Sequence, residues 1–428
     1  MQLFKYPEEN DWPELLKRPV LDSLSLEKTV SEILLNVKTK GDTALKEYTE
    51  KFGGPALENF AVKDFEIVGS GALIIPELKQ AISLAKENIE KFHSKQKEEE
   101  LWVETMPGIK CFRRSVAIEK VGLYIPGGTA PLFSTVLMLA IPAKLAGCKE
   151  IIICSPPDSK GNLHPAILYA AKICGVTKIF KAGGAQAIAA MAYGTESIQK
   201  VYKIFGPGNQ YVTCAKQLVN KEGIAIDMPA GPSELAVLAD EFCVPEFVAA
   251  DLLSQAEHGA DSQVVLVCTN EKIIESIISE ISLQLKDLPR KEIAEKALKN
   301  SKAILVKDLN EGMHLLNEYA PEHLILACKE PNKISLQVKN AGSVFIGNFS
   351  CESAGDYASG TNHTLPTNGY AKAYSGVSLD SFVKKITFQE LTREGIKNIG
   401  SAIETMAEAE GLQAHKNAVT VRLKNLQK

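Results

Sequence analysis

The chain contains no long apolar run, no excess of one charge and no paired cysteines, and each absence excludes a class of protein. No apolar run approaches the roughly 20 residues that a membrane-spanning helix requires. The 48 basic and 52 acidic residues give a net charge of -4 and a pI near 6.1, without the clustered Lys and Arg of a nucleic-acid-binding surface. Residues 1–12 are polar and acidic, whereas a signal peptide is basic and then apolar. We therefore expect a cytoplasmic protein.

The nine cysteines form no CxxC pair and lie mostly within apolar segments, so they are expected to be small buried hydrophobic residues. A disulfide framework is not expected in a reducing compartment, and a thiolate metal site needs cysteine pairs. Any metal ligands must therefore come from the seven histidines and the carboxylates. The chain also has no GxxxxGK[ST] motif, which excludes a P-loop.

What the sequence does contain is an alternation of short apolar strands and helices. The first such run extends from Val121 to Val219, and a second, from Ser233 to Ile346, has a similar organisation. Alternation of this kind is typical of parallel sheets with helices on both faces. With 428 residues, the chain is also longer than the roughly 250 to 300 residues at which single cores stop growing. We predict an α/β fold with two Rossmann-like domains, each with a doubly wound, largely parallel sheet.

The ends of the chain differ from this pattern. Residues 1–22 contain three prolines and no clear periodicity, which indicates an N-terminal arm. Helices with one buried face are predicted over Leu24–Glu50 and Pro76–Glu99, and His93 is assigned to a solvated face. After Ser378 two further helices are predicted, at Phe388–Ile396 and Ile399–Met406, before a small helical C-terminal tail that carries a histidine.

One loop carries two residues suited to chemistry. Asp356 and His363 lie in the segment Gly355–Thr367, whose glycines and proline prevent a regular helix or strand throughout. Loops of this kind aim polar side chains into clefts that a rigid scaffold supports. The alternative is that Asp356 caps a turn and His363 lies on the surface.

A second candidate is Gln255-Ala-Glu-His258, which places two polar side chains three residues apart on one face of a helix. Zinc takes nitrogen, oxygen and sulfur ligands, and His258, Asp356 and His415 have suitable side chains. Glutamine is an uncommon ligand. Both residues could instead simply finish a helix, where its dipole favours histidine.

The acid–base candidate is Glu322-His323, between Pro321 and a predicted strand. Histidine exchanges protons near neutral pH, and a neighbouring carboxylate can orient it or activate water. The alternative is a surface dipeptide at the start of a strand.

The signal for a nucleotide is weaker. Gly206-Pro-Gly-Asn-Gln-Tyr211 follows an apolar strand and opens a helix, but it lacks the third glycine of GxGxxG. Tyr124 offers a ring before Pro126-Gly-Gly128, and Gln186 lies at a second helix N-terminus, where backbone N–H groups favour phosphate.

Taken together, these segments resemble the histidinol dehydrogenase family in content and in order along nearly the whole chain. The matching segments are Gly122–Gly128, Gly206–Asn209, Ile226–Glu234, Gln255–Gly259, Ala320–Leu324, Gly355–Thr367 and Glu410–His415. The resemblance implies a homodimeric, zinc-dependent enzyme of histidine biosynthesis. Such an enzyme oxidises L-histidinol through L-histidinal to L-histidine with two molecules of NAD.

The resemblance also implies roles for individual residues. Zinc, one ion per subunit, would be held by Gln255, His258, Asp356 and His415, the last from a partner subunit. The acid–base residues would be Glu322 and His323. Substrate contacts would come from the zinc ligands and His323, together with Ser233, His363 and Glu410, and NAD contacts from Tyr124, Gln186 and Asn209.

The expected domains follow from the same resemblance. They are the arm (1–22), a larger catalytic α/β domain (23–120 with 233–380), an incomplete Rossmann-like NAD-binding domain (121–232), and a helical tail exchanged in the dimer (381–428). Two other readings of the same residues are a zinc hydrolase that uses no dinucleotide and a metabolite-binding protein without turnover.

Overall fold

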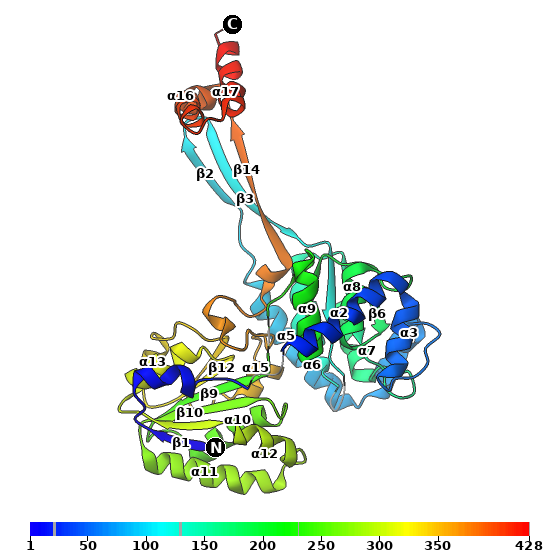
Figure 1. Ribbon diagram of the computed structural model, residues 1–428, viewed down its shortest axis with the longest axis vertical. Coiled ribbons are helices and arrows are strands. Elements are labelled where there is room, and N and C mark those ends of the chain that lie inside the picture. The colour runs from blue at the N-terminus through cyan, green and yellow to red at the C-terminus, as the bar shows by residue number, and fades with distance from the viewer. Residues whose placement is uncertain (20–22, 128–130, 230, 428) are drawn as a thin grey trace.

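The computed structural model describes residues 1–19, 23–127, 131–229 and 231–427 (Figure 1). Gly128 and Ala230, which belong to two of the motifs above, lie outside these ranges. Two α/β bodies lie beside each other, and a long stalk that carries the C-terminal helices projects away from both. Each body is built on a parallel sheet, which confirms the predicted fold class.

The first body contains a five-stranded sheet of order β6-β5-β4-β7-β8 in which every strand pair is parallel. Its strands are β4 Lys120–Tyr124, β5 Glu150–Ser155, β6 Lys178–Lys181, β7 Lys203–Phe205 and β8 Ala225–Ile226. Its crossover helices are α6 Phe133–Ala146, α7 Pro165–Cys174, α8 Gly184–Tyr193 and α9 Gln210–Lys221. Helices cover both faces, so the central strands are apolar on both sides.

Helices from the N-terminal quarter complete this first body. They are α2 Ser23–Lys40, α3 Asp42–Lys51, α4 Asp64–Gly69 and α5 Pro76–Ser94. The apolar faces of α2 and α3 pack with α8 and α9, and that of α5 packs with α6 and α7. This packing differs from the predicted division of the chain, which grouped residues 23–120 with residues 233–380.

The second body contains a six-stranded parallel sheet of order β1-β11-β10-β9-β12-β13. Its strands are β1 Gln2–Lys5, β9 Glu234–Ala239, β10 Gln263–Cys268, β11 Lys302–Leu305, β12 His323–Ala327 and β13 Ser343–Ile346. Its helices are α10 Pro245–Ala256, α11 Glu271–Gln284, α12 Lys291–Lys299, α13 Leu309–Tyr319, α14 Pro331–Ser335 and α15 Glu352–Tyr357. The N-terminal arm belongs here, because β1 extends the sheet at β11 and α1 (Trp12–Leu15) packs on one face.

The stalk is a three-stranded antiparallel sheet of order β14-β3-β2, with α16 (Arg393–Ala409) and α17 (Gln413–Asn425) at its tip. Its strands are β2 Leu101–Met106, β3 Ile109–Ala117 and β14 Val383–Leu391. The helix predicted from Phe388 is therefore wrong, as is the break before Ile399. Phe388 stacks on Phe112 with ring centroids 4.8 Å apart, and this cross-strand packing outweighs the local helical spacing.

The prediction that His93 is solvated is also wrong, since this side chain is fully buried. Its Nδ1 lies 2.9 Å from Oε1 of Gln96, which also accepts a hydrogen bond from the backbone of Leu379. A segment 283 residues after Gln96 thus contacts the end of α5.

The nine cysteines are all free, and burial raises the pKa of the thiols of Cys154, Cys174, Cys243, Cys268 and Cys328. Within the described ranges, no single helix is long and apolar enough to cross a membrane, and residues 64–73 and 76–94 reach that length only as a pair bent by 111°.

Candidate active site

A cleft of about 610 Å³ is lined by residues of both bodies and collects most of the candidate site residues. On the first body it lies beyond the carboxyl ends of β4 and β7, where ligands bind in open parallel sheets. On the second body it lies at the amino ends of β9 and β12. The cleft contains Ser233, Gln255, His258, Glu322, His323, Asp356, His363 and Asn209.

The acid–base candidates lie at the start of β12. Ala320 ends α13 with a positive φ of 52°, and the reversed chain then brings Glu322 and His323 to the cleft. Both side chains are buried, with exposed fractions of 6% and 4%, so the surface alternative is excluded. Their backbone anchor is Glu234, whose N–H donates to Oε2 of Glu322 at 2.9 Å.

The same residue fixes the orientation of the histidine ring. Nδ1 of His323 lies 3.2 Å from the carbonyl oxygen of Glu234, so Nδ1 must carry the proton that is donated. In the neutral ring, Nε2 then holds the lone pair. It is buried, has no hydrogen-bond partner among the described residues, and lies 3.7 Å from Oδ1 of Asp356. Nε2 is therefore the atom available to take a proton.

Burial and mutual repulsion change how these groups titrate. Burial raises the pKa of Glu322 to about 7 and that of Glu352 to about 8. Burial alone would lower the pKa of His323, but the carboxylates of Glu352, Glu322 and Asp356 outweigh it and raise that pKa to about 10. A bound cation would offset this negative charge and lower the pKa of His323 towards the range of a general base.

Several side chains at this end of the cleft can hold such a cation. Ligand atoms of His258, Glu352 and Asp356 all lie within 4.8 Å of one another. Gln255 is fully buried beside them at the end of α10, and both of its amide atoms have no hydrogen-bond partner in the described part of the chain. Buried polar atoms without partners are costly, so this donor set fits a zinc ion.

Sequence reasoning missed Glu352. The segment Gly355–Thr367 was treated as a loop, but α15 extends to Tyr357 and presents Glu352 and Asp356 one helical turn apart. The i, i+4 spacing of two acids was the available signal. Glu352 Oε1 lies 3.6 Å from Nδ1 of His323 and is also without a hydrogen-bond partner in the described residues.

His363 links the two bodies across the cleft. Its Nδ1 lies 3.0 Å from the carbonyl oxygen of Asp356, and its Nε2 lies 3.2 Å from Oγ1 of Thr135 on α6. Burial lowers its pKa, so the ring is neutral near pH 7. The surface alternative for this residue is excluded.

The three NAD candidates occupy different environments on the first body. Asn209 lines the cleft and caps α9, accepting hydrogen bonds from the backbone of Tyr211 and Val212. Tyr124 is only 4% exposed, which leaves little of its ring for stacking, and its hydroxyl accepts a hydrogen bond from Gly184 at the start of α8. Gln186 is also buried, with its Oε1 unpartnered in the described ranges.

The last two candidates are not brought to the cleft. Glu410 and His415 lie at the tip of the stalk, where both are exposed and far from the two bodies (Figure 1). A single chain therefore does not unite the predicted site residues.

Comparison with known proteins gives a consistent result. The family model of histidinol dehydrogenase matches residues 16–423. Histidinol dehydrogenase from Bacteroides thetaiotaomicron is 63% identical over 426 residues, with both chains covered completely. The chain belongs to the histidinol dehydrogenase family.

Other members of this family extend the match. The chloroplastic histidinol dehydrogenase of Arabidopsis thaliana is 54% identical, over 96% of this chain and 89% of its own. The crystal structure of histidinol dehydrogenase from Elizabethkingia anophelis superposes with a TM-score of 0.97 at 56% identity, covering 100% and 99% of the two chains. Membership in the histidinol dehydrogenase family makes this chain an oxidoreductase.

The donor set predicts which substitutions release the metal. We expect the protein to bind about one zinc per subunit, and both His258→Ala and Gln255→Leu to weaken binding by roughly 100-fold. If zinc is held by Gln255, His258 and Asp356, with Glu352 beside these ligands, Glu352→Gln should weaken binding less, by roughly 10-fold. Zinc content after dialysis against a graded chelator, measured by elemental analysis, checks this.

The control is His314→Ala, which removes an exposed histidine outside the cleft. Loss of zinc in Glu352→Gln with retention in Gln255→Leu would contradict the ligand set.

Proposed function

We propose that the chain is a zinc-dependent histidinol dehydrogenase that oxidises L-histidinol through L-histidinal to L-histidine with two molecules of NAD. The observation that carries this proposal is the buried pair Glu322 and His323, with the free Nε2 of His323 directed at the donor cluster around Asp356. A pair of proton-transfer groups beside a cation site suits an alcohol oxidation followed by a hydration.

Substrate binding depends on the cluster and its neighbours. Gln255, His258 and Asp356 would hold zinc, and a bound zinc would anchor the imidazole and amino groups of the substrate. Ser233 and His363 line the same cleft and would contact the remaining polar atoms. Holding the carbinol carbon in one place lets the proton and the hydride leave from a fixed geometry.

In the first oxidation, Nε2 of His323 accepts the hydroxyl proton of the substrate. A bound NAD would supply the acceptor for the hydride of the carbinol carbon, and a second NAD would do so in the second oxidation. In the second, Glu322 accepts a proton from water as the oxygen bonds to the aldehyde carbon. As the hydrate forms, His323 returns the first proton to the carbonyl oxygen, which frees Nε2 again. His323 then takes a hydroxyl proton of the hydrate as the second hydride leaves the same carbon. Glu322 lies next to His323, so one position of the substrate can serve both steps.

NAD binding is proposed for the first body, through Asn209, Tyr124 and Gln186. The Gly206 turn beside Asn209 is held rigidly by a buried ion pair, Lys216 with Asp227. Lys216 donates to the carbonyl oxygen of Gly206 at 2.9 Å, and the N–H of Gly206 donates to Asp227 at 2.8 Å. A fixed turn at a helix N-terminus favours the phosphates of a dinucleotide.

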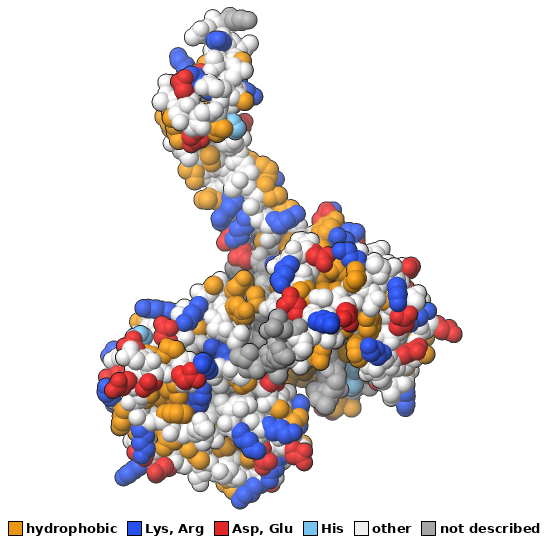
Figure 2. Space-filling view, viewed as in Figure 1, with side chains coloured by type: hydrophobic (Ala, Val, Ile, Leu, Met, Phe, Trp, Pro, Cys, Tyr) orange, Lys and Arg blue, Asp and Glu red, His pale blue; other side chains and the backbone are white. Residues whose placement is uncertain are grey.

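We also propose a homodimer in which the tail of one subunit completes the site of the other, and the surface of the stalk supports this proposal. Apolar side chains along the stalk and its tip are exposed in the single chain (Figure 2), and they include Leu101, Trp102, Val103, Met106, Ile386, Met406 and Leu412. Exposed apolar surface of this extent marks an interaction site. A partner seated there could bring Glu410 and His415 to the cleft. The cytoplasmic location stays a prediction.

A direct assay tests the proposed reaction. We expect NAD reduction when the protein is mixed with L-histidinol, loss of turnover after chelation, and recovery with zinc. Glu322→Gln should impair oxidation of supplied L-histidinal more than oxidation of L-histidinol, and His323→Asn should lower both by roughly 100-fold or more. Absorbance of reduced nicotinamide is the measurement. Binding of histidinol without nicotinamide reduction would instead favour a zinc hydrolase or a metabolite-binding protein.

The pKa of Glu322 predicts a pH dependence. Because burial raises that pKa from its usual 4.5 to about 7, the carboxyl stays protonated at pH values where it is normally ionised. The base form is lost as the pH falls through this pKa, which a bound cation would lower below 7, so kcat with L-histidinal should fall about tenfold for each pH unit below the resulting midpoint. Initial rates across the neutral range, with zinc content checked at each pH, measure this. A flat profile into the acid range would contradict the assignment.

A further inference from the structure

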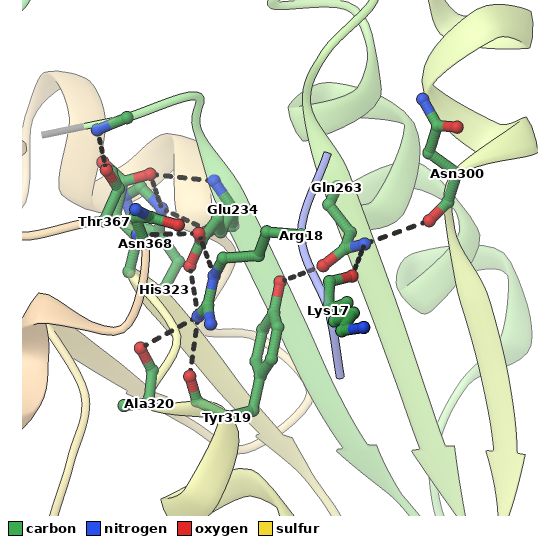
Figure 3. A network of polar contacts seen from close by, with 12 residues as sticks. Lys17, Arg18, Glu234, Gln263, Asn300, Tyr319, Ala320, His323, Thr367 and Asn368 are labelled. Carbon is green, nitrogen blue, oxygen red and sulfur yellow. Dashed lines mark hydrogen bonds and ion pairs between the residues drawn. The ribbon is translucent and has the colours of Figure 1, made fainter. Parts of the chain in front are cut away.

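The N-terminal arm inserts a partly buried arginine close to the acid–base pair. Arg18 donates from Nε and Nη2 to the two carboxylate oxygens of Glu234, the second at 2.9 Å (Figure 3). Its side chain is 15% exposed and that of Glu234 is 3% exposed. The guanidinium also lies over the ring of Tyr319, 4.1 Å from its centroid. A paired fork of this kind fixes the position of the carboxylate as well as its charge.

Glu234 is the residue on which both acid–base side chains depend. Its N–H donates to Glu322 and its carbonyl oxygen faces Nδ1 of His323. The backbone of Glu234 therefore positions the carboxylate of Glu322 through its N–H group. Its carbonyl oxygen selects the tautomer of His323. A shift of Glu234 would move both groups together.

The ion pair of Arg18 and Glu234 also forms hydrogen bonds with two turns that contain strained residues, Ala320 and Asn368. Among the described residues, the non-glycine positions with positive φ are Tyr6, Ala320 and Asn368. Nη2 of Arg18 lies 2.6 Å from the carbonyl oxygen of Tyr319 and 3.5 Å from that of Ala320. The N–H of Asn368 donates to Oε1 of Glu234 at 2.7 Å.

Such conformations persist where the surroundings hold them in place. The first turn leads directly into Glu322 and His323. The second follows the loop that carries Asp356 and His363. The ion pair thus holds the two backbone segments that position the candidate site residues in the cleft.

We propose that Arg18 is a positioning residue for the reaction: through Glu234 it holds Glu322 and His323 in their productive geometry, which couples docking of the N-terminal arm to turnover. This inference rests on the proposed function. Arg18 acts through Glu234 and contacts neither substrate nor cofactor.

The test compares variants that keep the fold. Arg18→Lys retains the positive charge beside Glu234 but loses the fork, so the buried carboxylate keeps a counter-charge. Two controls lie nearby. Lys5→Ala removes an exposed ion pair with Glu271 elsewhere on the arm. Tyr319→Phe removes the hydroxyl bond to Gln263 while leaving the ring under the guanidinium.

We expect Arg18→Lys to lower kcat by roughly 10- to 100-fold with both L-histidinol and L-histidinal, because small displacements of catalytic groups have effects of that size. KM for L-histidinol and the zinc content should stay unchanged. Both controls should keep the wild-type kcat. In a background that carries both Glu322→Gln and His323→Asn, Arg18→Lys should leave the residual rate unchanged, since its effect passes through those two residues.

Several results would overturn the proposal. They are an unchanged kcat in Arg18→Lys, a raised KM with normal kcat, a fall for only one of the two substrates, or a further fall in the background that lacks both Glu322 and His323. A melting temperature lowered without any change in kcat would show a purely structural role.

A crystal structure of Arg18→Lys gives a test that needs no turnover. Glu322 and His323 should be displaced by about 0.5 Å or more from their wild-type positions. Unchanged positions would overturn the inference. If the wild-type protein fails to reduce NAD with L-histidinol, the proposed function fails, whereas normal wild-type turnover with unimpaired Arg18→Lys removes only the role of Arg18.

Discussion

Burial of ionisable groups in the cleft is the constraint on which the rest of the structure depends. Glu322, His323 and Glu352 are almost completely removed from solvent, and Gln255 has both amide atoms unpartnered among the residues described. Each buried polar atom left without a partner costs about 1–3 kcal/mol. The described residues therefore leave the cluster under-satisfied, and a bound cation with a polar substrate would supply the missing partners. A site that is complete only when loaded is a preorganised binding site.

The topology explains how such a cluster arises between two ordinary parallel sheets. The first body contributes loops at the carboxyl ends of β4 and β7, and the second contributes the amino ends of β9 and β12. A nucleotide-type loop around Asn209 can then face a set of proton-transfer groups across one cleft. The stalk extends away from both bodies, so the tail that it carries is free to reach another molecule (Figure 1).

Patterns within short stretches of sequence predicted most of the two bodies. Strands such as β5 and β10 and their crossover helices follow from apolar runs and helical spacing, because both signals are local. Most residues of the cleft were also identified as candidates. Their roles came from the resemblance to a family, because the spacing alone was equally consistent with surface or helix-end residues that have no function.

Long-range packing accounts for what was missed. Phe388 has helical neighbours in sequence but pairs across strands with Phe112, and His93 is covered by the backbone of Leu379. Arg18 gave no signal, because its partner Glu234 lies 216 residues away. Only the folded chain brings such pairs together.

The central claim, that two chains share each site, is tested most directly by a mixed dimer. His323→Asn and His415→Ala subunits are each expected to be inactive alone. After dissociation and reassembly together, each mixed dimer would contain one site with both residues intact, so activity should return. Mixed dimers verified by mass spectrometry that remain inactive would contradict the account.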